Sequence, residues 1–401
     1  MLDIFSMRSF FKFILSAIFV LMSTEDMMAY DCEVDGIYYN LRDGEAVVTY
    51  NSENRYSGSV TIPGSIIYEG KTYTVSKVGS SAFSNCEDLI SVDMPNSITE
   101  IDNWAFQRCK NLASVKLSSN LKNISYMAFY ECSQISSMSL PEGLETIGNE
   151  AFESCRNLSS INMPNSVISV GFRAFRWCDK LSTPLYNQRL FVFCPTSTQG
   201  QYAIPDGIQV VCSSAFEYCR TSSVAIPNSV TVIGSNAFCA SSIESVTIPQ
   251  QVKIIESYTF DRCYKLKKVV LPSSLDSIGN GAFNQIYDGI DVYCYATTPP
   301  STTKANQSPS SFDLNLLTKS TLHVPAASID KYTECYQWSE FGKIVALTDE
   351  ELAAGIDADV KISNSSNIIY YDVSGRQHNV LQQGINIIQK SSGKRVKVMK
   401  R

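Results

Sequence analysis

The sequence predicts a β-rich α/β solenoid, in which short repeats stack in register along one axis. A phenylalanine recurs nine times at the same point of a motif whose usual form is Val/Ile-x-x-x-Ala-Phe-x-x-Cys, with spacings of 23, 23, 23, 23, 41, 22, 22 and 23 residues. A fixed period in this range is the sequence signature of repeat architectures. The phenylalanines, which we expect to fill the interior, are Phe83, Phe106, Phe129, Phe152, Phe175, Phe216, Phe238, Phe260 and Phe283.

A second observation is the alternation of apolar and polar residues after each motif. In residues 91–95, Val92 and Met94 alternate with polar residues and a proline follows. This pattern predicts a short strand with one buried face, which ends where proline removes a backbone donor. It recurs at residues 114–117, 137–140, 160–163, 223–226 and 245–248. We expect these strands to stack in parallel, and each repeat depends on its neighbours because it cannot bury its own apolar face.

Seven of the 13 cysteines follow the same period. They lie three residues after a repeat phenylalanine: Cys86, Cys109, Cys132, Cys155, Cys178, Cys219 and Cys263. A fixed repeat position favours a ladder of small buried side chains, with occasional disulfides between repeats or metal capture as alternatives. Zinc is disfavoured because the chain has no Cys-x-x-Cys pair and only two histidines, both outside the repeats. The cysteines outside the period are Cys32 near the start of the chain, and Cys194, Cys212, Cys239, Cys294 and Cys335.

Two interruptions depart from the period. The spacing of 41 residues after Phe175 contains residues 184–193, which predict two short strands joined at Asn187-Gln188. We therefore expect a hairpin inserted at about residues 184–201 that leaves the stack continuous. From Asn284 onward, Pro-rich and Ser-rich residues predict a long loop in a cap that covers the exposed edge of the solenoid.

The ends of the chain have a different composition. Arg8 and Lys12 precede an apolar run of ten residues, 13–22, which is too short to span a bilayer and predicts an export signal. No transmembrane span is expected in the mature chain. The expected divisions are a signal peptide at 1–29, a β-rich N-terminal cap at 30–75, repeats at 76–283, a C-terminal cap at 284–348, a linker at 349–367 and a small β-module of three strands at 368–401.

The charge distribution argues against nucleic acid as a partner. Residues 376–401 contain seven Lys or Arg and no acid, so the rest of the chain has 26 Lys or Arg against 39 Asp or Glu. An acidic body without a basic stripe does not suit a phosphate backbone.

The repeat, in forms such as residues 147–164, is similar to the BspA-like leucine-rich repeat family of bacterial surface proteins. The resemblance covers about residues 30–348, including the opening segment 34–39 and the closing segment 321–325. It implies a leucine-rich-repeat solenoid of stacked 22–23-residue repeats, displayed on or shed from bacteria of the mouth and gut. Several members adhere to host matrix proteins or to other bacteria, and the family shares no catalytic residues.

The tail resembles the C-terminal sorting modules of proteins sent across the outer membrane by type IX secretion. This resemblance depends on the segment Tyr-Asp-Val-Ser-Gly-Arg at 371–376 and on a basic final strand. It implies that the protein is exported to the cell surface at the outer membrane or to the medium. A small β-appendage packed on the cap is the structural alternative.

The sequence contains no motif of a catalytic, cofactor or metal site. P-loop, Gly-x-Gly-x-x-Gly, Gly-x-Ser-x-Gly and His-Glu-x-x-His patterns are all missing. We therefore predict a protein that is not an enzyme and needs no cofactor. Six aromatic residues flank the Ala-Phe corners, where they form a recognition patch or pack between adjacent loops: Trp104, Phe172, Trp177, Tyr218, Tyr258 and Tyr264.

The outward positions of the strands are the predicted binding face. They form a polar, lightly charged row, which suits an extended protein or glycan on a host or bacterial surface: Asp93, Lys116, Ser139, Asn162, Thr247 and Lys268. The leading hypothesis is a noncatalytic surface or secreted protein that mediates adhesion to host matrix proteins, host cells or other bacteria. The alternative is a surface-layer or biofilm scaffold without a dedicated ligand. The chain is expected to be monomeric or to self-associate.

Overall fold

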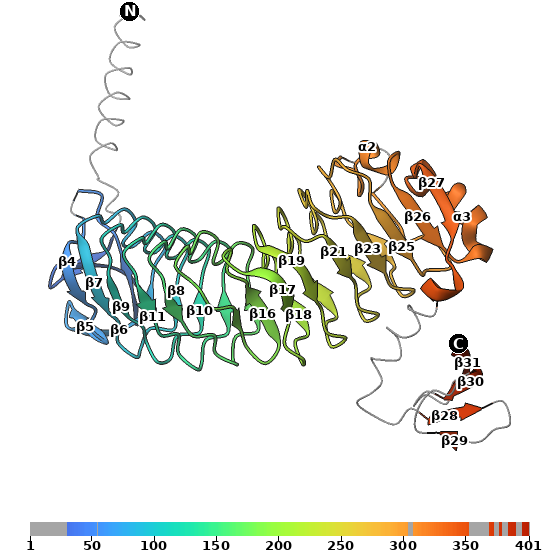
Figure 1. The fold of residues 1–401 in the computed structure, drawn as a ribbon. Helices are drawn as coiled ribbons and strands as arrows, with labels where there is room; N and C mark the ends of the chain where they lie inside the picture. Colours follow the sequence, from blue (N-terminus) through green and yellow to red (C-terminus); the bar gives the residue numbers. More distant parts are fainter. Residues whose placement is uncertain are drawn as a thin grey trace, which may run out of the picture. The chain divides into compact units, whose positions relative to one another are not determined.

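In the computed structural model the chain forms two compact units, residues 1–180 and 181–401. The structure describes residues 30–352 except 54 and 304–307, and the backbone of four strands between 369 and 400. The predicted signal peptide and residues 353–367 of the predicted linker lie outside the described residues. Both units are built from stacked coils with parallel strands, so the predicted β-rich solenoid is confirmed (Figure 1).

Unit 1 begins with an antiparallel cap and continues as two parallel rows of strands. The cap strands are β1 (Cys32–Val34), β2 (Ile37–Arg42), β3 (Glu45–Thr49) and β5 (Ser65–Tyr68). The first row continues from β3 through β6 (Lys71–Val78), β8 (Glu100–Ile101), β10 (Asn123–Ile124), β12 (Thr146–Ile147) and β14 (Ser169–Val170). The second row contains β4 (Gly58–Thr61), β7 (Leu89–Asp93), β9 (Ser114–Lys116), β11 (Ser137–Met138) and β13 (Ser160–Ile161). The second row holds the strands predicted from the alternating pattern.

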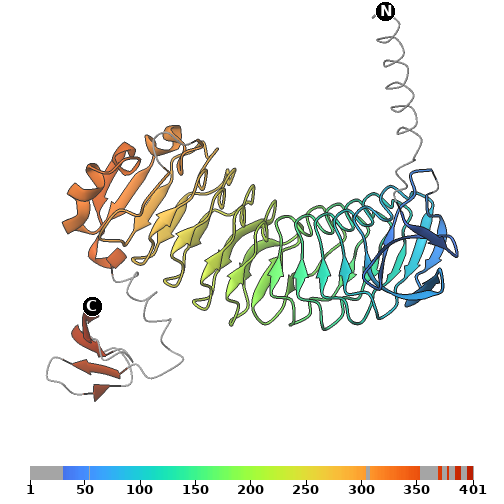
Figure 2. The ribbon, with the colours of Figure 1, turned by 180° about the vertical axis from the view of Figure 1, so that it is seen from behind.

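Unit 2 repeats the two rows with longer strands in one of them (Figure 2). The shorter row contains β15 (Leu185–Tyr186), β16 (Leu190–Phe193), β18 (Val210–Val211), β20 (Val232–Ile233), β22 (Ile254–Ile255) and β24 (Ser277–Ile278). The longer row is a seven-stranded parallel sheet of β17 (Gln199–Ala203), β19 (Arg220–Ala225), β21 (Ser245–Thr247), β23 (Lys268–Leu271), β25 (Asp291–Cys294), β26 (Thr321–Val324) and β27 (Lys343–Ala346).

Short helices and a small sheet complete the second half of the chain. The helices are α2 (Leu314–Leu317), η1 (Ala326–Ser328), α3 (Ile329–Thr333) and η2 (Trp338–Glu340). The tail forms an antiparallel sheet in the order β29 (Gln377–His378), β28 (Ile369–Asp372), β30 (Gly384–Gln389) and β31 (Arg395–Lys400). The sheet therefore contains the three predicted strands and one additional short strand.

The repeat phenylalanines form a stack of parallel rings inside each unit. In unit 1, Phe106 and Phe129 have ring centroids 5.1 Å apart and planes inclined by 4°. In unit 2, Phe238 and Phe260 are 5.4 Å apart and inclined by 10°. Offset aromatic pairs at such distances add to the stability that burial alone provides. All nine repeat phenylalanines are buried, as predicted.

Each phenylalanine is held in a tight corner of the backbone. The residues two before and two after it have positive φ, as at Trp104 (56°) and Arg108 (59°) around Phe106. The N–H of Phe106 donates to the carbonyl of Ala128 in the next coil at 2.7 Å. Small residues before the corner allow this approach, since a Cβ on Gly148 would lie 2.5 Å from the backbone carbon of Ser125.

The cysteines of the period are buried thiols that face the preceding coil. Cys109, Cys132, Cys155, Cys178 and Cys263 each lie within 3.2 Å of the carbonyl oxygen of the preceding repeat phenylalanine, to which the thiol donates. Burial raises the pKa of Cys155 and of Cys263 to about 12, so both remain neutral thiols at physiological pH. The ladder is thus a row of small apolar side chains with a weak donor that satisfies a backbone carbonyl.

The first interruption supplies a coil to the stack of unit 2. Strands β15 and β16 pair in antiparallel fashion, and the Asn187 side chain accepts hydrogen bonds from the N–H groups of Arg189 and Leu190 between them. Strand β16 also pairs in parallel with β18. The ring of Phe191 stacks on Phe216 at 4.8 Å, so a phenylalanine outside the motif extends the ring stack.

Candidate binding face

The longer sheet of unit 2 forms an open hollow of about 710 Å³ on its outward side. Strands β19, β21, β23 and β25 supply the floor, which includes Ser223, Ser245 and Thr247. Lys268, Tyr293 and Glu351 supply the larger polar side chains. Alternation along each strand turns valines such as Val246 and Val269 inward, where both are buried, and turns these polar residues outward.

Three side chains from neighbouring strands stack on one another, and two of them, Lys268 and Tyr293, line the hollow. The Lys268 Nζ atom lies 4.4 Å from the ring centroid of Tyr293, a cation–π arrangement. The ring of His323 lies 4.2 Å from the ring of Tyr293 and is nearly parallel to it. The stack arises because Tyr293 pairs in register with Val270 on one side and with His323 on the other.

Two carboxylates surround this stack. The Asp291 carboxylate lies 3.8 Å from Nε2 of His323, and the Glu351 carboxylate lies 3.6 Å from Nδ1 of the same ring. Burial raises the pKa of Tyr293, and the charges of Asp291 and Glu351 raise it further, so the phenol stays a hydrogen-bond donor. The hollow therefore combines a cation, the Glu351 carboxylate and neutral hydroxyl groups, and Asp291 lies beside it against His323.

A turn of the C-terminal cap borders the hollow. The Tyr295 hydroxyl donates to the Glu351 carbonyl at 2.7 Å. The Glu351 carboxylate in turn accepts from the N–H of Thr348 at 2.7 Å, and the Thr348 hydroxyl accepts from the Glu351 N–H. These bonds hold Glu351 against the strand face without using a ligand.

The candidate residues predicted in unit 1 have partners within their own face. Lys116 pairs with Asp93 at 3.0 Å on the neighbouring strand. The Asn162 amide accepts from the N–H of Leu140 at 2.7 Å and donates to its carbonyl at 2.9 Å. Asn162 thus extends the backbone ladder where β11 ends, and Ser139 stays exposed between these groups.

Of the six predicted face residues, Thr247 and Lys268 line the hollow of unit 2 together. Sequence reasoning missed Tyr293, His323 and Glu351. A sequence signal for the strands of Tyr293 and His323 exists, since residues 291–294 and 321–324 alternate like the repeat strands. Residues 284–320 lack the Ala-Phe motif, however, and this favours the interpretation as a cap loop.

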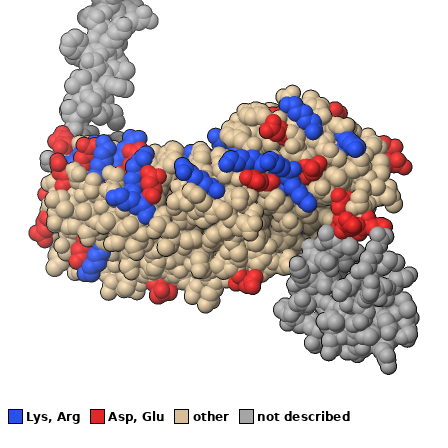
Figure 3. Space-filling model, in the orientation of Figure 1, with Lys and Arg blue, Asp and Glu red and all other residues tan. Residues whose placement is uncertain are grey.

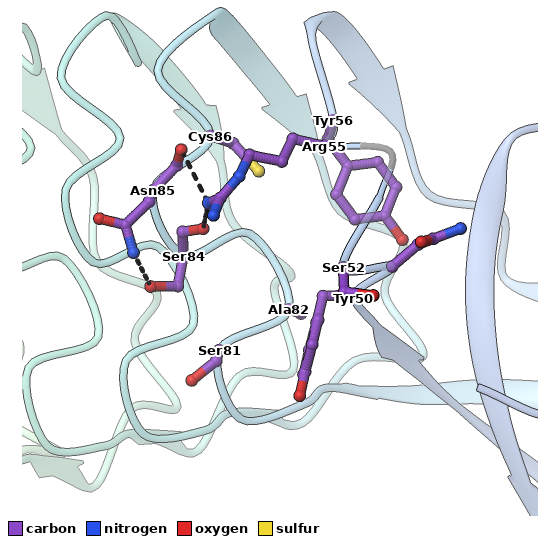
Figure 4. Close-up of a pocket in the computed structure, with 10 residues that line it drawn as sticks. Tyr50, Ser52, Arg55, Tyr56, Ser81, Ala82, Ser84, Asn85 and Cys86 are labelled. Carbon is purple, nitrogen blue, oxygen red and sulfur yellow. Dashed lines mark hydrogen bonds between the residues drawn. The ribbon is translucent and has the colours of Figure 1, made fainter. Parts of the chain in front are cut away.

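A second hollow, of about 250 Å³, lies at the N-terminal cap (Figure 4). The guanidinium of Arg55 in this hollow already has backbone partners, because its Nη1 donates to the carbonyls of Ser84 at 2.9 Å and Asn85 at 3.1 Å. The Tyr56 hydroxyl donates to the carbonyl of Thr49, and its ring contacts Phe83. These contacts join the cap to the first corner and begin the ring stack. Arg55 and Tyr56 therefore have a structural role that requires no ligand.

The corner aromatics pack largely against each other or against arginine. Trp104 contacts Tyr126 at 5.5 Å between ring centroids, and Tyr264 stacks on Tyr287 at 5.7 Å. The guanidinium of Arg176 lies 3.9 Å from the ring centroid of Trp177. Packing between adjacent corners therefore accounts for these rings better than a separate recognition patch.

The visible face of the molecule is sparsely charged, with most Lys and Arg gathered along its upper margin (Figure 3). Within the described residues, no group of three or more His, Cys, Asp or Glu could hold a metal ion. None of the helices described is both long and apolar enough to cross a membrane.

Comparison with known families agrees with this geometry. The model of the BspA type leucine rich repeat region matches residues 65–182 and 188–296, with six copies. The chain belongs to the BspA type leucine-rich repeat family. The match spans the ring stack of unit 1 and most of that of unit 2, and thus the coils that carry Thr247 and Lys268. No curated protein matches the chain.

Several solved structures are similar to this BspA type chain. A leucine-rich repeat protein from Bacteroides ovatus is 20% identical with a TM-score of 0.44, covering 80% of this chain and 100% of its own. The pneumococcal vaccine antigen PcpA is 17% identical with a TM-score of 0.48, covering 80% of this chain and 99% of its own. The leucine-rich repeat protein of T. pallidum is 24% identical with a TM-score of 0.39, covering 52% of this chain and 88% of its own.

Proposed function

We propose that the chain is a noncatalytic surface or secreted protein that binds protein ligands through the strand face of unit 2. The observation that carries this proposal is the hollow of about 710 Å³, which is lined by Lys268 and Tyr293 from adjacent strands, with His323 stacked on the Tyr293 ring beside it. Regular parallel strands present such side chains at a fixed spacing, which suits an extended ligand held by several weak contacts.

A protein ligand suits this face better than a glycan. Sugar rings are usually held on an open aromatic face, whereas Lys268 covers one face of Tyr293 and His323 covers the other. The exposed groups that remain are a cation, carboxylates and hydroxyls, which match the backbone and charged side chains of a polypeptide. Host matrix proteins, host cell surfaces and other bacteria are the proposed sources of this ligand.

The test is a binding assay with the mature chain and a matched pair of lysine substitutions. The chain from residue 30 to 401 is applied to immobilised matrix proteins, host cells, bacterial cells and a glycan panel. Lys268→Glu reverses the charge inside the hollow and should lower protein binding at least tenfold. Lys265→Glu makes the same change at an exposed position three residues away that does not line the hollow, and should leave binding unchanged.

Equal binding by both variants would remove this face as the site. Binding confined to the glycan panel would contradict the choice of ligand, and self-association without capture of any partner would favour a scaffold instead.

We also propose that residues 1–29 direct export and that residues 368–401 direct sorting to the surface. The support is the apolar run 13–22 and the antiparallel sheet of the tail. Recovered surface protein should begin at Tyr30, and deletion after residue 367 should retain the chain inside the cell envelope. Normal surface display of the truncated chain would leave the tail as a structural appendage.

A further inference from the structure

The coil that interrupts the sequence period brings two cysteines together. The N–H of Cys194 donates to the carbonyl of Ala215 at 2.7 Å, as the N–H of Phe216 does to Ala237 in the next coil. Cys194 therefore occupies the backbone position that a repeat phenylalanine occupies elsewhere. The missing ring is supplied by Phe191 from strand β16.

Because Cys194 is smaller than phenylalanine, the thiol of Cys219 in the next coil has different contacts from the other repeat thiols. In the regular coils the repeat thiol donates to the carbonyl of the preceding phenylalanine. Cys219 instead has its Sγ atom 3.2 Å from the Sγ atom of Cys194, and both residues are fully buried. The Pro195 carbonyl lies 3.5 Å from the Cys219 thiol and 3.9 Å from that of Cys194.

We propose that Cys194 and Cys219 form a disulfide that joins this coil to the next one when the chain folds under oxidising conditions. The sulfur atoms must approach by only about 1.2 Å to reach the bond length of about 2.05 Å.

The oxidant is a second disulfide, either of an exported thiol–disulfide oxidoreductase or of a small-molecule thiol such as glutathione. The Cys219 thiolate attacks one sulfur of that disulfide, which releases one thiol of the oxidant. Cys194 then loses its proton and attacks the Cys219 sulfur of the mixed disulfide, which releases the second thiol. The protein loses two electrons and two protons, and the oxidant gains them. Because both sulfurs are buried in the folded unit, the reaction takes place while the coil closes.

The bond would stabilise the least regular coil of unit 2. The closed loop contains the register shift between Gly200 and Gln201 on β17 and the turn at Pro195–Thr198. A cross-link limits the conformations that this loop can adopt in the unfolded chain, and it thereby stabilises the folded coil.

The test counts thiols in the full chain exported to a bacterial periplasm and unfolded in denaturant without reductant. The expected result is 11 reactive thiols, two fewer than the 13 cysteines of the sequence. Trypsin leaves Cys194, Cys212 and Cys219 in one peptide, residues 190–220, so cleavage at Asp206 and Glu217 is needed to show which two are linked. Linked peptides carrying Cys194 and Cys219 support the proposal.

Two variants make the result decisive. Cys194→Ala should show 12 free thiols and no link, and reductant should not change its melting temperature. Cys212→Ala, a buried cysteine outside the pair, should keep the link with ten free thiols and should melt several degrees lower in reductant, like the unchanged chain. Thirteen free thiols in folded, exported chain, or a link that omits Cys194, overturns the proposal. Refolding of the reduced chain in a glutathione redox buffer provides a second measurement with the same outcomes.

Discussion

In unit 1 the rings from Phe83 to Phe175 stack at separations of 4.8–5.3 Å, and in unit 2 the rings from Phe191 to Phe312 stack at 4.8–5.4 Å. The outward faces of the two units differ more than their interiors. On the strand face of unit 1 Asp93 pairs with Lys116, whereas in unit 2 Lys268 and Tyr293 line a hollow and His323 stacks on Tyr293 beside it. The comparison separates a uniform repeat interior, which sets stability, from outward residues that differ between the units and on which the proposed recognition depends.

The largest expected effect tests whether the two interiors are equivalent. Phe129→Ala in unit 1 and Phe238→Ala in unit 2 each remove a fully buried ring from between two others. Each should lower the free energy of unfolding by about 3–5 kcal/mol. Hydrogen exchange should report the loss in the unit that carries the substitution.

The matched control is Tyr130→Ala, which removes a partly exposed ring next to Phe129. If Phe238→Ala lowered the free energy of unfolding much less than Phe129→Ala did, the interiors of the two units would not be equivalent.

The thiol ladder gives a pH test that should also be the same in both units. Cys155 and Cys263 have pKa values of about 12 in the folded protein, against an ordinary value of 9.0. Above pH 9 the unfolded chain releases these protons and the folded chain retains them, so stability must fall as pH rises. Each thiol should lower the free energy of unfolding by about 1.4 kcal/mol per pH unit between pH 9 and 12.

Denaturant titrations in reductant from pH 8 to 10.5 measure this slope. Cys155→Ala and Cys263→Ala should each reduce the slope of the free energy of unfolding against pH by the same amount. This holds whatever the stability of each variant at pH 8. An unchanged slope in either variant would mean that the thiol ionises within the folded coil.

The period of the phenylalanines was enough to predict the solenoid, because every coil repeats the same buried contacts. The left-handed corners could not be predicted, since residues as different as Trp104 and Glu150 adopt positive φ there and a glycine, Gly281, occupies only one of these positions. The corner is imposed by hydrogen bonds to the next coil, which a local pattern does not contain. Phe191 was missed for a related reason, because its ring reaches the stack from a strand position and not from the motif.

The residues of the proposed binding face could be predicted from the sequence only where the repeat motif continues. Thr247 and Lys268 follow from the alternating pattern, but Tyr293 and His323 become neighbours through pairing of β25 with β26 across a connection of 26 residues. Such a connection hides the register of the two strands, so the stack is visible only in the structure.

A third prediction separates recognition from stability. Tyr293→Ala removes the centre of the stack in unit 2 and should lower ligand binding about tenfold, with little change in melting temperature because the ring lies on the outward face. Asn162→Ala removes two hydrogen bonds to the backbone of Leu140 in unit 1. It should cost about 1–2 kcal/mol of stability and leave binding unchanged. If Asn162→Ala abolished binding and Tyr293→Ala did not, the assignment of the two faces would be reversed.

The smallest expected effect concerns the pair of Asp93 and Lys116 in unit 1. Its atoms are 3.0 Å apart, but the Lys116 side chain is 74% exposed and that of Asp93 is 43% exposed, so water and salt screen the attraction. Exposed pairs of this kind contribute about 0–1 kcal/mol. A double-mutant cycle with Asp93→Asn and Lys116→Met should therefore give a coupling energy below about 1 kcal/mol that disappears in 1 M salt. A larger coupling that persists in salt would mean that this pair organises the strand face of unit 1, and the contrast between the two faces would then rest on the hollow alone.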